Sequence, residues 1–201
     1  DFISRKDIPH LLFHGSAGTG KTTLAKILTK NIPCDVMYVN ASDNTGVDFV
    51  RDKIKPFACS MGFHELKVVI LDEADYMSTN SQASLRNLME TYSKSTRFIL
   101  TCNYKNRLID PLHSRCSVID FIIAKDDKPK LAKDFFGRVK NILETENVKY
   151  EPRVIMEVLT KYFPDWRRTI NELQRYSTSG QIDAGILVNI SEVNINELIT
   201  A

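Results

Sequence analysis

The sequence lacks the features of a secreted, membrane-spanning or zinc-scaffolded protein. We recognise no signal peptide, and no apolar run is long enough to span a bilayer. The cysteines form no C-x-x-C pair, and no histidine spacing completes a zinc site. We therefore expect no membrane partner, and we expect free thiols in a reducing cytoplasm at Cys34, Cys59, Cys102 and Cys116.

The chain also has little net charge, no internal repeat and no low-complexity segment. Its 27 basic residues nearly balance its 25 acidic ones, which leaves a formal charge of +2 over 201 residues. This excludes a polycation, so any contact with nucleic acid has to come from a local patch. Hydrophobic residues make up 43% of the chain, which is normal for a globular protein with a core.

An initiator methionine is absent as well, and the first apolar strand begins only eleven residues from the start. We interpret the chain as a fragment of a longer protein. Its length suits one domain or one and a half.

The most informative stretch present runs from Leu11 to Thr23. An apolar run indicates a buried strand, the next eight residues fit G-x-x-x-x-G-K-[ST], and apolar residues then recur at helical spacing. Backbone N–H groups of such a loop, with a helix N-terminus behind them, bind phosphate. The alternative is a plain strand–turn–helix corner. The predicted nucleotide-binding residues are Gly15, Ser16, Ala17, Gly18, Thr19, Gly20, Lys21, Thr22 and Thr23.

Two acids end a second apolar run, KVVILDEAD over residues 67–75. Four consecutive apolar residues predict a strand buried on both faces of a parallel sheet. Open sheets of this kind bind ligands at the carboxyl ends of their strands. There Asp72 would hold Mg²⁺ together with the Thr22 hydroxyl, and Glu73 would orient an attacking water. The alternative is a pair of solvated turn acids.

A third apolar run, RFILTCN over residues 97–103, ends in Asn103. The end of this strand reaches the same edge of the sheet as Asp72, so an amide there could bind a γ-phosphate or the attacking water. An asparagine that merely caps a turn is the alternative.

The remaining pattern predicts an α/β fold with a parallel five-stranded sheet. Further strands are expected over 36–40 and 117–122, and helices over 47–60 and 80–93. After Ala124 we expect strands to stop and helices to follow, from Pro129 to about 146, over 152–163 and 166–178, with a short one over 183–189. The predicted domains are therefore a P-loop core over 1–124 and a small helical lid over 125–201.

Three arginines occupy unusual positions. Arg167 and Arg168 fall in the first turn of a predicted helix, where cations oppose the helix dipole unless an anion is bound nearby. A surface pair with Asp165 as counterion is the alternative. Arg115 precedes the last strand at a domain edge, which suits an arginine finger offered to a neighbouring subunit, although edge arginines are common.

Taken together, these motifs resemble the small ATPase subunits of AAA+ clamp loaders. GSAGTGKTT, VVILDEAD, the Asn103 strand end, SRC and PDWRRTIN match that family in order and spacing over nearly the whole chain. The phage-type loader of T4-like viruses is similar to this chain in the segments IPHLLFHG, VDFVR and FPDWRRTI.

The resemblance implies ATP and Mg²⁺ as cofactors and a DNA-stimulated and clamp-stimulated ATPase in a bacterial or phage-infected cytoplasm. It implies that Asn103 and Arg167 are nucleotide sensors and that Arg115 acts in trans in a pentamer of loader subunits. It also implies that Arg51 and Lys55 contact the backbone of primer–template DNA, and that Met61 and Phe63 contact the sliding clamp; a loop folded back on the core is the alternative for the last pair.

The chain departs from the family pattern at both ends, where an adenine-binding N-terminal segment and a C-terminal helical collar are expected to be missing. Three other functions stay open. These are a DEAD-type helicase, another AAA+ DNA machine such as a helicase loader or branch-migration motor, and a scaffold subunit that binds ATP without hydrolysing it.

Overall fold

The computed structural model describes residues 2–43, 45–178 and 180–183, and it divides the chain into two compact units. The first unit is Asp1–Ile122 and the second begins at Ile123. The helix expected over 183–189 lies almost wholly outside the described residues.

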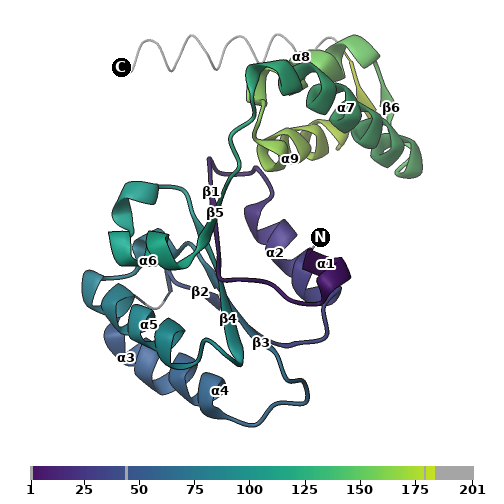
Figure 1. The fold of residues 1–201 in the computed structure, drawn as a ribbon. Coiled ribbons are helices and arrows are strands. Elements are labelled where there is room, and N and C mark those ends of the chain that lie inside the picture. Colours follow the sequence, from purple (N-terminus) through teal and green to yellow (C-terminus); the bar gives the residue numbers. More distant parts are fainter. Residues whose placement is uncertain (1, 44, 179, 184–201) are drawn as a thin grey trace. The chain divides into compact units, whose positions relative to one another are not determined.

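The first unit is built around a five-stranded sheet (Figure 1). Its strands are β1 (Leu11–His14), β2 (Asp35–Asn40), β3 (Lys67–Asp72), β4 (Thr96–Cys102) and β5 (Ser117–Asp120). The order is β2-β3-β4-β1-β5 and every pairing is parallel, which confirms the predicted sheet. The central strands are buried on both faces, which is why their sequences are continuous apolar runs.

Helices cover both faces of this sheet. α1 (Phe2–Arg5) and α2 (Lys21–Lys30) lie on one side, and α3 (Val47–Phe49), α4 (Lys55–Cys59), α5 (Thr79–Thr91) and α6 (Asp110–Arg115) on the other (Figure 1). Ala25 and Leu28 of α2 pack with Leu11 and Phe13, while Leu12 faces the opposite cluster, because successive strand residues point to opposite faces. Short 3₁₀ turns follow two strands, at Ala74–Tyr76 and Lys105–Arg107.

The helix expected over 47–60 differs from the prediction in its middle. A π-helical segment, Val50–Ile54, separates α3 from α4, and the Lys55 N–H bonds to the carbonyl of Val50. Pro56 follows directly, and because proline has no N–H it cannot continue the regular α-helical hydrogen bonds through this turn. The wider turn leaves both Val50 and Ile54 fully buried.

Among its described residues, the second unit contains three α-helices: α7 (Lys128–Thr145), α8 (Pro152–Tyr162) and α9 (Trp166–Ser177). Asp165 caps α9, as predicted, by accepting a 2.9 Å hydrogen bond from the Arg168 N–H. The helices enclose a core of their own, centred on Val139, Val158 and Leu173. This confirms the helical domain.

The expectation that strands stop after Ala124 is wrong. β6 (Lys149–Tyr150) and β7 (Gln181–Ile182) pair in parallel as a second small sheet. Two-residue strands leave almost no pattern in a sequence. Here only Ile182 is buried, and its pairing partner lies more than thirty residues away along the chain.

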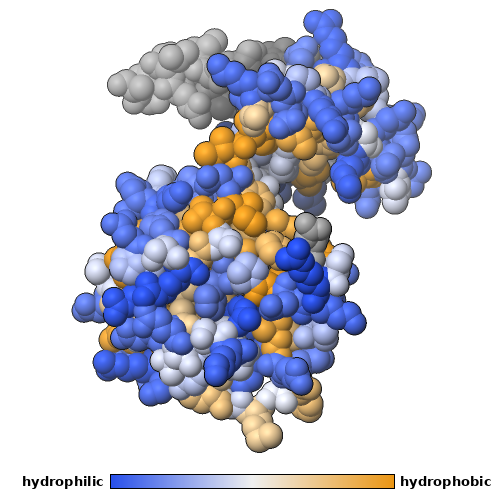
Figure 2. All heavy atoms as spheres, in the orientation of Figure 1, coloured by the Kyte–Doolittle hydropathy of each residue, from blue (hydrophilic) through white to orange (hydrophobic). Residues whose placement is uncertain are grey.

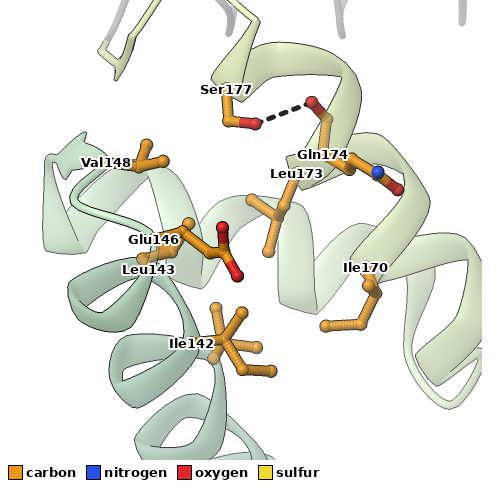
Figure 3. Close-up of a pocket in the computed structure, with 9 residues that line it drawn as sticks. Ile142, Leu143, Glu146, Val148, Ile170, Leu173, Gln174 and Ser177 are labelled. Atoms are coloured by element: carbon orange, nitrogen blue, oxygen red, sulfur yellow. Dashed lines mark hydrogen bonds between the residues drawn. The ribbon is translucent and has the colours of Figure 1, made fainter.

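A cavity of about 350 Å³ opens between α7 and α9 of the second unit (Figure 3). Ile142, Leu143, Ile170 and Leu173 give it an apolar lining, with Glu146 at its side. None of the residues predicted for the functional site lines it.

Candidate nucleotide-binding site

The site begins where β1 runs through the glycine loop into α2. Gly20 is the N-cap of α2, with φ 96° and ψ 11°, a left-handed conformation that residues with a side chain seldom adopt. Lys21 and Thr22 are therefore the first two residues of the helix. Their backbone N–H groups belong to the end of the helix that binds anions, since the first N–H groups have no partner within the helix.

The side chain of Lys21 is buried and joins the loop to the neighbouring strand. Its Nζ donates to the carbonyl oxygens of Gly15 and Ser16, both at 2.8 Å, and to Asn103 Oδ1 at 2.9 Å. Asn103 directly follows β4, which pairs with β1 in parallel. The structure thus brings the predicted lysine and the predicted sensor amide together.

Asp72 lies at the end of β3 and accepts three hydrogen bonds from hydroxyl groups. Thr22 Oγ1 donates to Oδ1 at 2.6 Å, Thr101 Oγ1 donates to the same oxygen, and the Tyr38 hydroxyl donates to Oδ2 at 2.7 Å. The Thr22–Asp72 pair was expected. Tyr38 and Thr101 were not, because nothing in a strand sequence marks which residues of neighbouring strands lie beside an acid.

The environment of Asp72 favours its charged form. Burial raises the pKa of this carboxyl, but its hydroxyl donors and the positive charge of Lys26 outweigh burial and leave the pKa below its ordinary value. The same contact acts oppositely on the phenol. Burial, followed by the hydrogen bond to Asp72, raises the pKa of Tyr38 to about 12, so Tyr38 remains a donor at neutral pH.

Glu73 follows Asp72 with a backbone in the left-handed region, at φ 56° and ψ 43°. Such a conformation costs a residue with a side chain about 1 kcal/mol or more and is concentrated at functional sites. Its N–H donates to Thr101 Oγ1 at 3.1 Å, while its carboxylate has no hydrogen-bond partner among the residues the structure describes. The carboxylate is therefore available to a water molecule or a ligand.

Asp75 is a residue that sequence reasoning missed. It is only 5% exposed, and its Oδ2 accepts from the backbone N–H groups of Asn103 at 3.2 Å and Tyr104 at 3.0 Å. These bonds fix the end of β4 relative to the acids of β3. Asp75 therefore holds the backbone of Asn103 while Lys21 holds its side chain.

These side chains suit a magnesium–nucleotide complex. Mg²⁺ takes hard oxygen ligands and typically binds through one or two carboxylates together with substrate phosphates. Asp72 and the Thr22 hydroxyl supply such oxygens side by side. Within the part of the chain that the structure describes, no group of three or more His, Cys, Asp or Glu side chains could hold a metal by itself. Phosphate oxygens would have to complete the coordination.

Arg115 is the last residue of α6, just before β5 in the chain. Its Nη2 forms an ion pair with Glu90 of α5, and its Nη1 donates to the Pro111 carbonyl at 2.8 Å. Sequence reasoning gave Glu90 no role. The guanidinium is partly exposed and is held in place by residues of its own chain.

Arg167 and Arg168 lie in the first turn of α9 in the second unit, and both are exposed. The Arg168 guanidinium lies 4.6 Å from the centre of the Tyr162 ring. This cation–π contact within the second unit accounts for the position of Arg168 without a bound anion. A contact between Arg167 and the phosphate loop would join the two units and stays a prediction.

Arg51 and Lys55 are both exposed on the segment that includes the π-helix. Their predicted contact with DNA stays a prediction.

Met61 and Phe63 are completely exposed, at 101% and 102% of their reference areas. They lie in the loop between α4 and β3, where Figure 2 shows mildly hydrophobic side chains projecting at the lower edge of the first unit. The alternative that this loop folds back on the core is therefore wrong.

The loop is fixed in place by Asp35. One carboxylate oxygen of Asp35 accepts from the His64 N–H, and the other contacts His64 Nδ1, both at 3.1 Å. These hydrogen bonds from His64 lower the pKa of Asp35. A Cβ atom on Gly62 would lie 2.0 Å from Asp35 Oδ2, so a larger residue there would displace the Asp35 carboxylate from its present position.

Among the residues that the structure describes, no helix is long and apolar enough to cross a membrane.

Two protein-family models match the chain. The ATPase family associated with various cellular activities (AAA) matches residues 11–124, and the AAA+ ATPase lid domain of the sliding-clamp-loader large subunit matches residues 127–188.

Curated relatives agree with both matches. A replication factor C small subunit of Halobacterium salinarum is 41% identical over 89% of this chain and 56% of its own length. The sliding-clamp-loader large subunit of Enterobacteria phage T4 is 41% identical over 92% of this chain and 59% of its own length. The chain thus spans little more than half the length of these relatives.

Among solved structures, the Thermotoga maritima RuvB Holliday junction branch migration motor superimposes with a TM-score of 0.73. The match covers 96% of this chain and 64% of that one, at 17% sequence identity. At this identity the likeness shows the fold alone.

Proposed function

Because this chain belongs to the AAA family of ATPases, we propose that it is the ATP-hydrolysing part of a sliding-clamp loader subunit. One observation carries the ATPase assignment: Lys21 and Thr22, which end the phosphate loop, are each hydrogen-bonded to the end of a different strand. Lys21 bonds to Asn103 after β4, and Thr22 bonds to Asp72 at the end of β3. The lid-domain match over residues 127–188 and the names of the relatives support clamp loading in particular.

The proposal gives each residue of the site a task. The loop over residues 15–23 and Lys21 bind the phosphates, and Thr22 and Asp72 hold Mg²⁺, which supplies charge neutralisation on the phosphate oxygens when bound. Glu73 orients the attacking water, since its carboxylate has no competing hydrogen bond among the described residues. The Asn103 amide bonds to the terminal phosphate or the water.

The remaining roles involve partners. Arg167 reads the terminal phosphate from the lid, and Arg115 completes the site of the neighbouring subunit within a pentamer. Arg51 and Lys55 contact the backbone of primer–template DNA without reading its sequence. Met61 and Phe63 contact the sliding clamp, and their complete exposure supports this. In the proposed cycle, ATP binding opens the clamp and hydrolysis releases it on DNA. The proposal places this activity in a bacterial or phage-infected cytoplasm.

The test is an ATPase assay on the full-length gene product assembled with its partner subunits. Hydrolysis is expected to rise when both the sliding clamp and primed DNA are added, and to stay low with either one alone. Hydrolysis that ignores the clamp but rises with DNA, together with strand unwinding or branch migration, would contradict the clamp-loader assignment. ATP binding without hydrolysis in the complete assembly would instead support the scaffold alternative.

A further inference from the structure

The carboxylate of Asp72 is held by hydroxyl groups that come from three different elements. Thr22 belongs to α2, Thr101 to β4 and Tyr38 to β2. Thr22 and Thr101 both donate to Oδ1, whereas Tyr38 is the only side chain among the described residues that donates a hydrogen bond to Oδ2, at 2.7 Å.

This division has a geometric consequence. The torsion about the Cβ–Cγ bond of an aspartate has a broad energy minimum, and rotation about it moves both oxygens together. The two threonines restrain this rotation through Oδ1, and Tyr38 restrains it from the opposite side of the group, through Oδ2. Tyr38 therefore shares in setting the orientation of the carboxylate, and it is the donor that acts on Oδ2.

The tyrosine ring itself is held in place. Lys26 Nζ lies 4.4 Å from the ring centre, a cation–π distance. Lys26 is four residues after Thr22 on α2, so the two share one face of that helix. On β2, Tyr38 pairs with Ile70, and Asn40 pairs with Asp72, so the phenol reaches the acid from two residues further back on the neighbouring strand. One helix face and one edge strand thus converge on a single carboxylate.

We propose that Tyr38 is a positioning residue for magnesium, acting through Asp72. The proposal rests on the function proposed above, in which Thr22 and Asp72 hold the ion. Thr22 is able to keep its bond to Asp72 while it serves as a ligand, because a hydroxyl has one proton to donate and two lone pairs to offer. All three hydroxyl bonds are then compatible with a bound ion, and the bond from Tyr38 helps to hold the remaining lone pairs of the carboxylate in one direction.

A packing role for Tyr38 is the alternative to a positioning role. Tyr38 is 45% exposed on an edge strand, a place where tyrosine is common for packing reasons. A tyrosine retained only for packing would be replaceable by phenylalanine without effect on metal binding. A positioning residue would not, since phenylalanine lacks the hydroxyl.

The experiment measures the affinity of the 201-residue chain for a fluorescent ADP analogue, first in EDTA and then over a titration with magnesium chloride. Tyr38→Phe is expected to raise the magnesium concentration needed for half-maximal effect about tenfold, the low end of the loss seen when partners that orient metal ligands are removed. Its affinity in EDTA and its melting temperature without nucleotide are expected to match those of the wild type.

Tyr150→Phe is the matched control, because Tyr150 also donates to a carboxylate, Glu144 Oε1 at 3.2 Å, but in the second unit. It is expected to leave the magnesium midpoint unchanged. A wild-type midpoint in Tyr38→Phe would overturn the proposal, and so would an equal loss of affinity in EDTA and in magnesium, which indicates a structural role. If the wild type binds the analogue with no response to magnesium, the metal site itself is wrong and the proposed function fails with it.

Discussion

Lys21 and Asn103 are joined by a 2.9 Å hydrogen bond from Nζ to Oδ1, although 82 positions separate them in the chain. The lysine is buried in the phosphate loop and the amide ends a neighbouring strand. A ligand that attracts the lysine therefore also acts on the strand end, and Asp75 ties that strand end to the acids of β3.

Asn103→Ala is expected to reduce the rate of hydrolysis far more than the affinity for nucleotide. Loss of one donor aimed at developing charge lowers kcat by about 10²–10³-fold. The measurement is steady-state hydrolysis in the assembled complex, alongside nucleotide titration. Asn106→Ala is the control, since Asn106 is exposed in the 3₁₀ turn just beyond. A fall in affinity as large as the fall in rate would show that Asn103 only anchors the lysine.

Lys21→Met is expected to weaken nucleotide binding by about 10–100-fold, the effect of losing a charge-assisted hydrogen bond. Lys30→Met, at the exposed end of the same helix, is expected to bind like the wild type. Equilibrium titration of both variants makes the comparison. Equal binding by the two would mean that the loop does not hold phosphate through this lysine.

Arg115→Ala is expected to leave nucleotide affinity intact and to lower hydrolysis in the assembled complex by about 10³-fold or more, as for other arginine fingers. Glu90→Gln distinguishes a role of Arg115 as a finger from its role in the ion pair, because this variant removes the charge opposite Arg115 and keeps the guanidinium. Mixing Arg115→Ala subunits with wild-type subunits should impair the neighbouring site. Normal hydrolysis in an assembly made wholly of the variant would rule the finger out.

The double change Met61→Ala and Phe63→Ala is expected to leave the melting temperature within about 1 °C of the wild type, because fully exposed side chains contribute little to folding. Binding to the sliding clamp should fall by about tenfold or more in a pull-down or surface-plasmon measurement. The control Met156→Ala removes another exposed methionine, in the second unit. Undiminished clamp binding would mean that the clamp contacts another surface.

Folding stability is expected to decrease as the pH falls from 6.5 towards 4, because of His10. Burial, and next the charge of Arg97, lower the pKa of His10 from 6.5 to about 4. The neutral ring accepts the Phe98 N–H at Nδ1, 3.1 Å away, and protonation removes that acceptor. Between pH 6.5 and 4 the unfolded chain binds a proton at His10 and the folded chain does not. The stability that neutral His10 contributes is therefore complete above pH 6.5 and is lost as the pH falls towards 4.

Urea unfolding at several pH values from 7 to 4.5 measures the effect. His10→Gln, which keeps an acceptor oxygen and does not titrate, should show a shallower decrease over the same range. Identical pH dependence in the two proteins would remove His10 as the cause.

Much of the architecture could be predicted because its signals are local. The buried strands β1, β3 and β4 are unbroken apolar runs, and Asp165 precedes its helix at capping distance. The errors came where a local signal was weak or misleading. β6 and β7 have two residues each, and the π-helical turn before Pro56 has the composition of an ordinary helix.

The sequence by itself determined the phosphate loop, the acids Asp72 and Glu73 and the strand end at Asn103, because each is a contiguous motif attached to a recognisable strand. Only the tertiary structure decided which residues surround them. The order β2-β3-β4-β1-β5 differs from chain order, so Tyr38, Thr101 and Thr22 meet at Asp72 from three separate parts of the chain. Strand pairing brings such partners together, and no spacing along the chain encodes it.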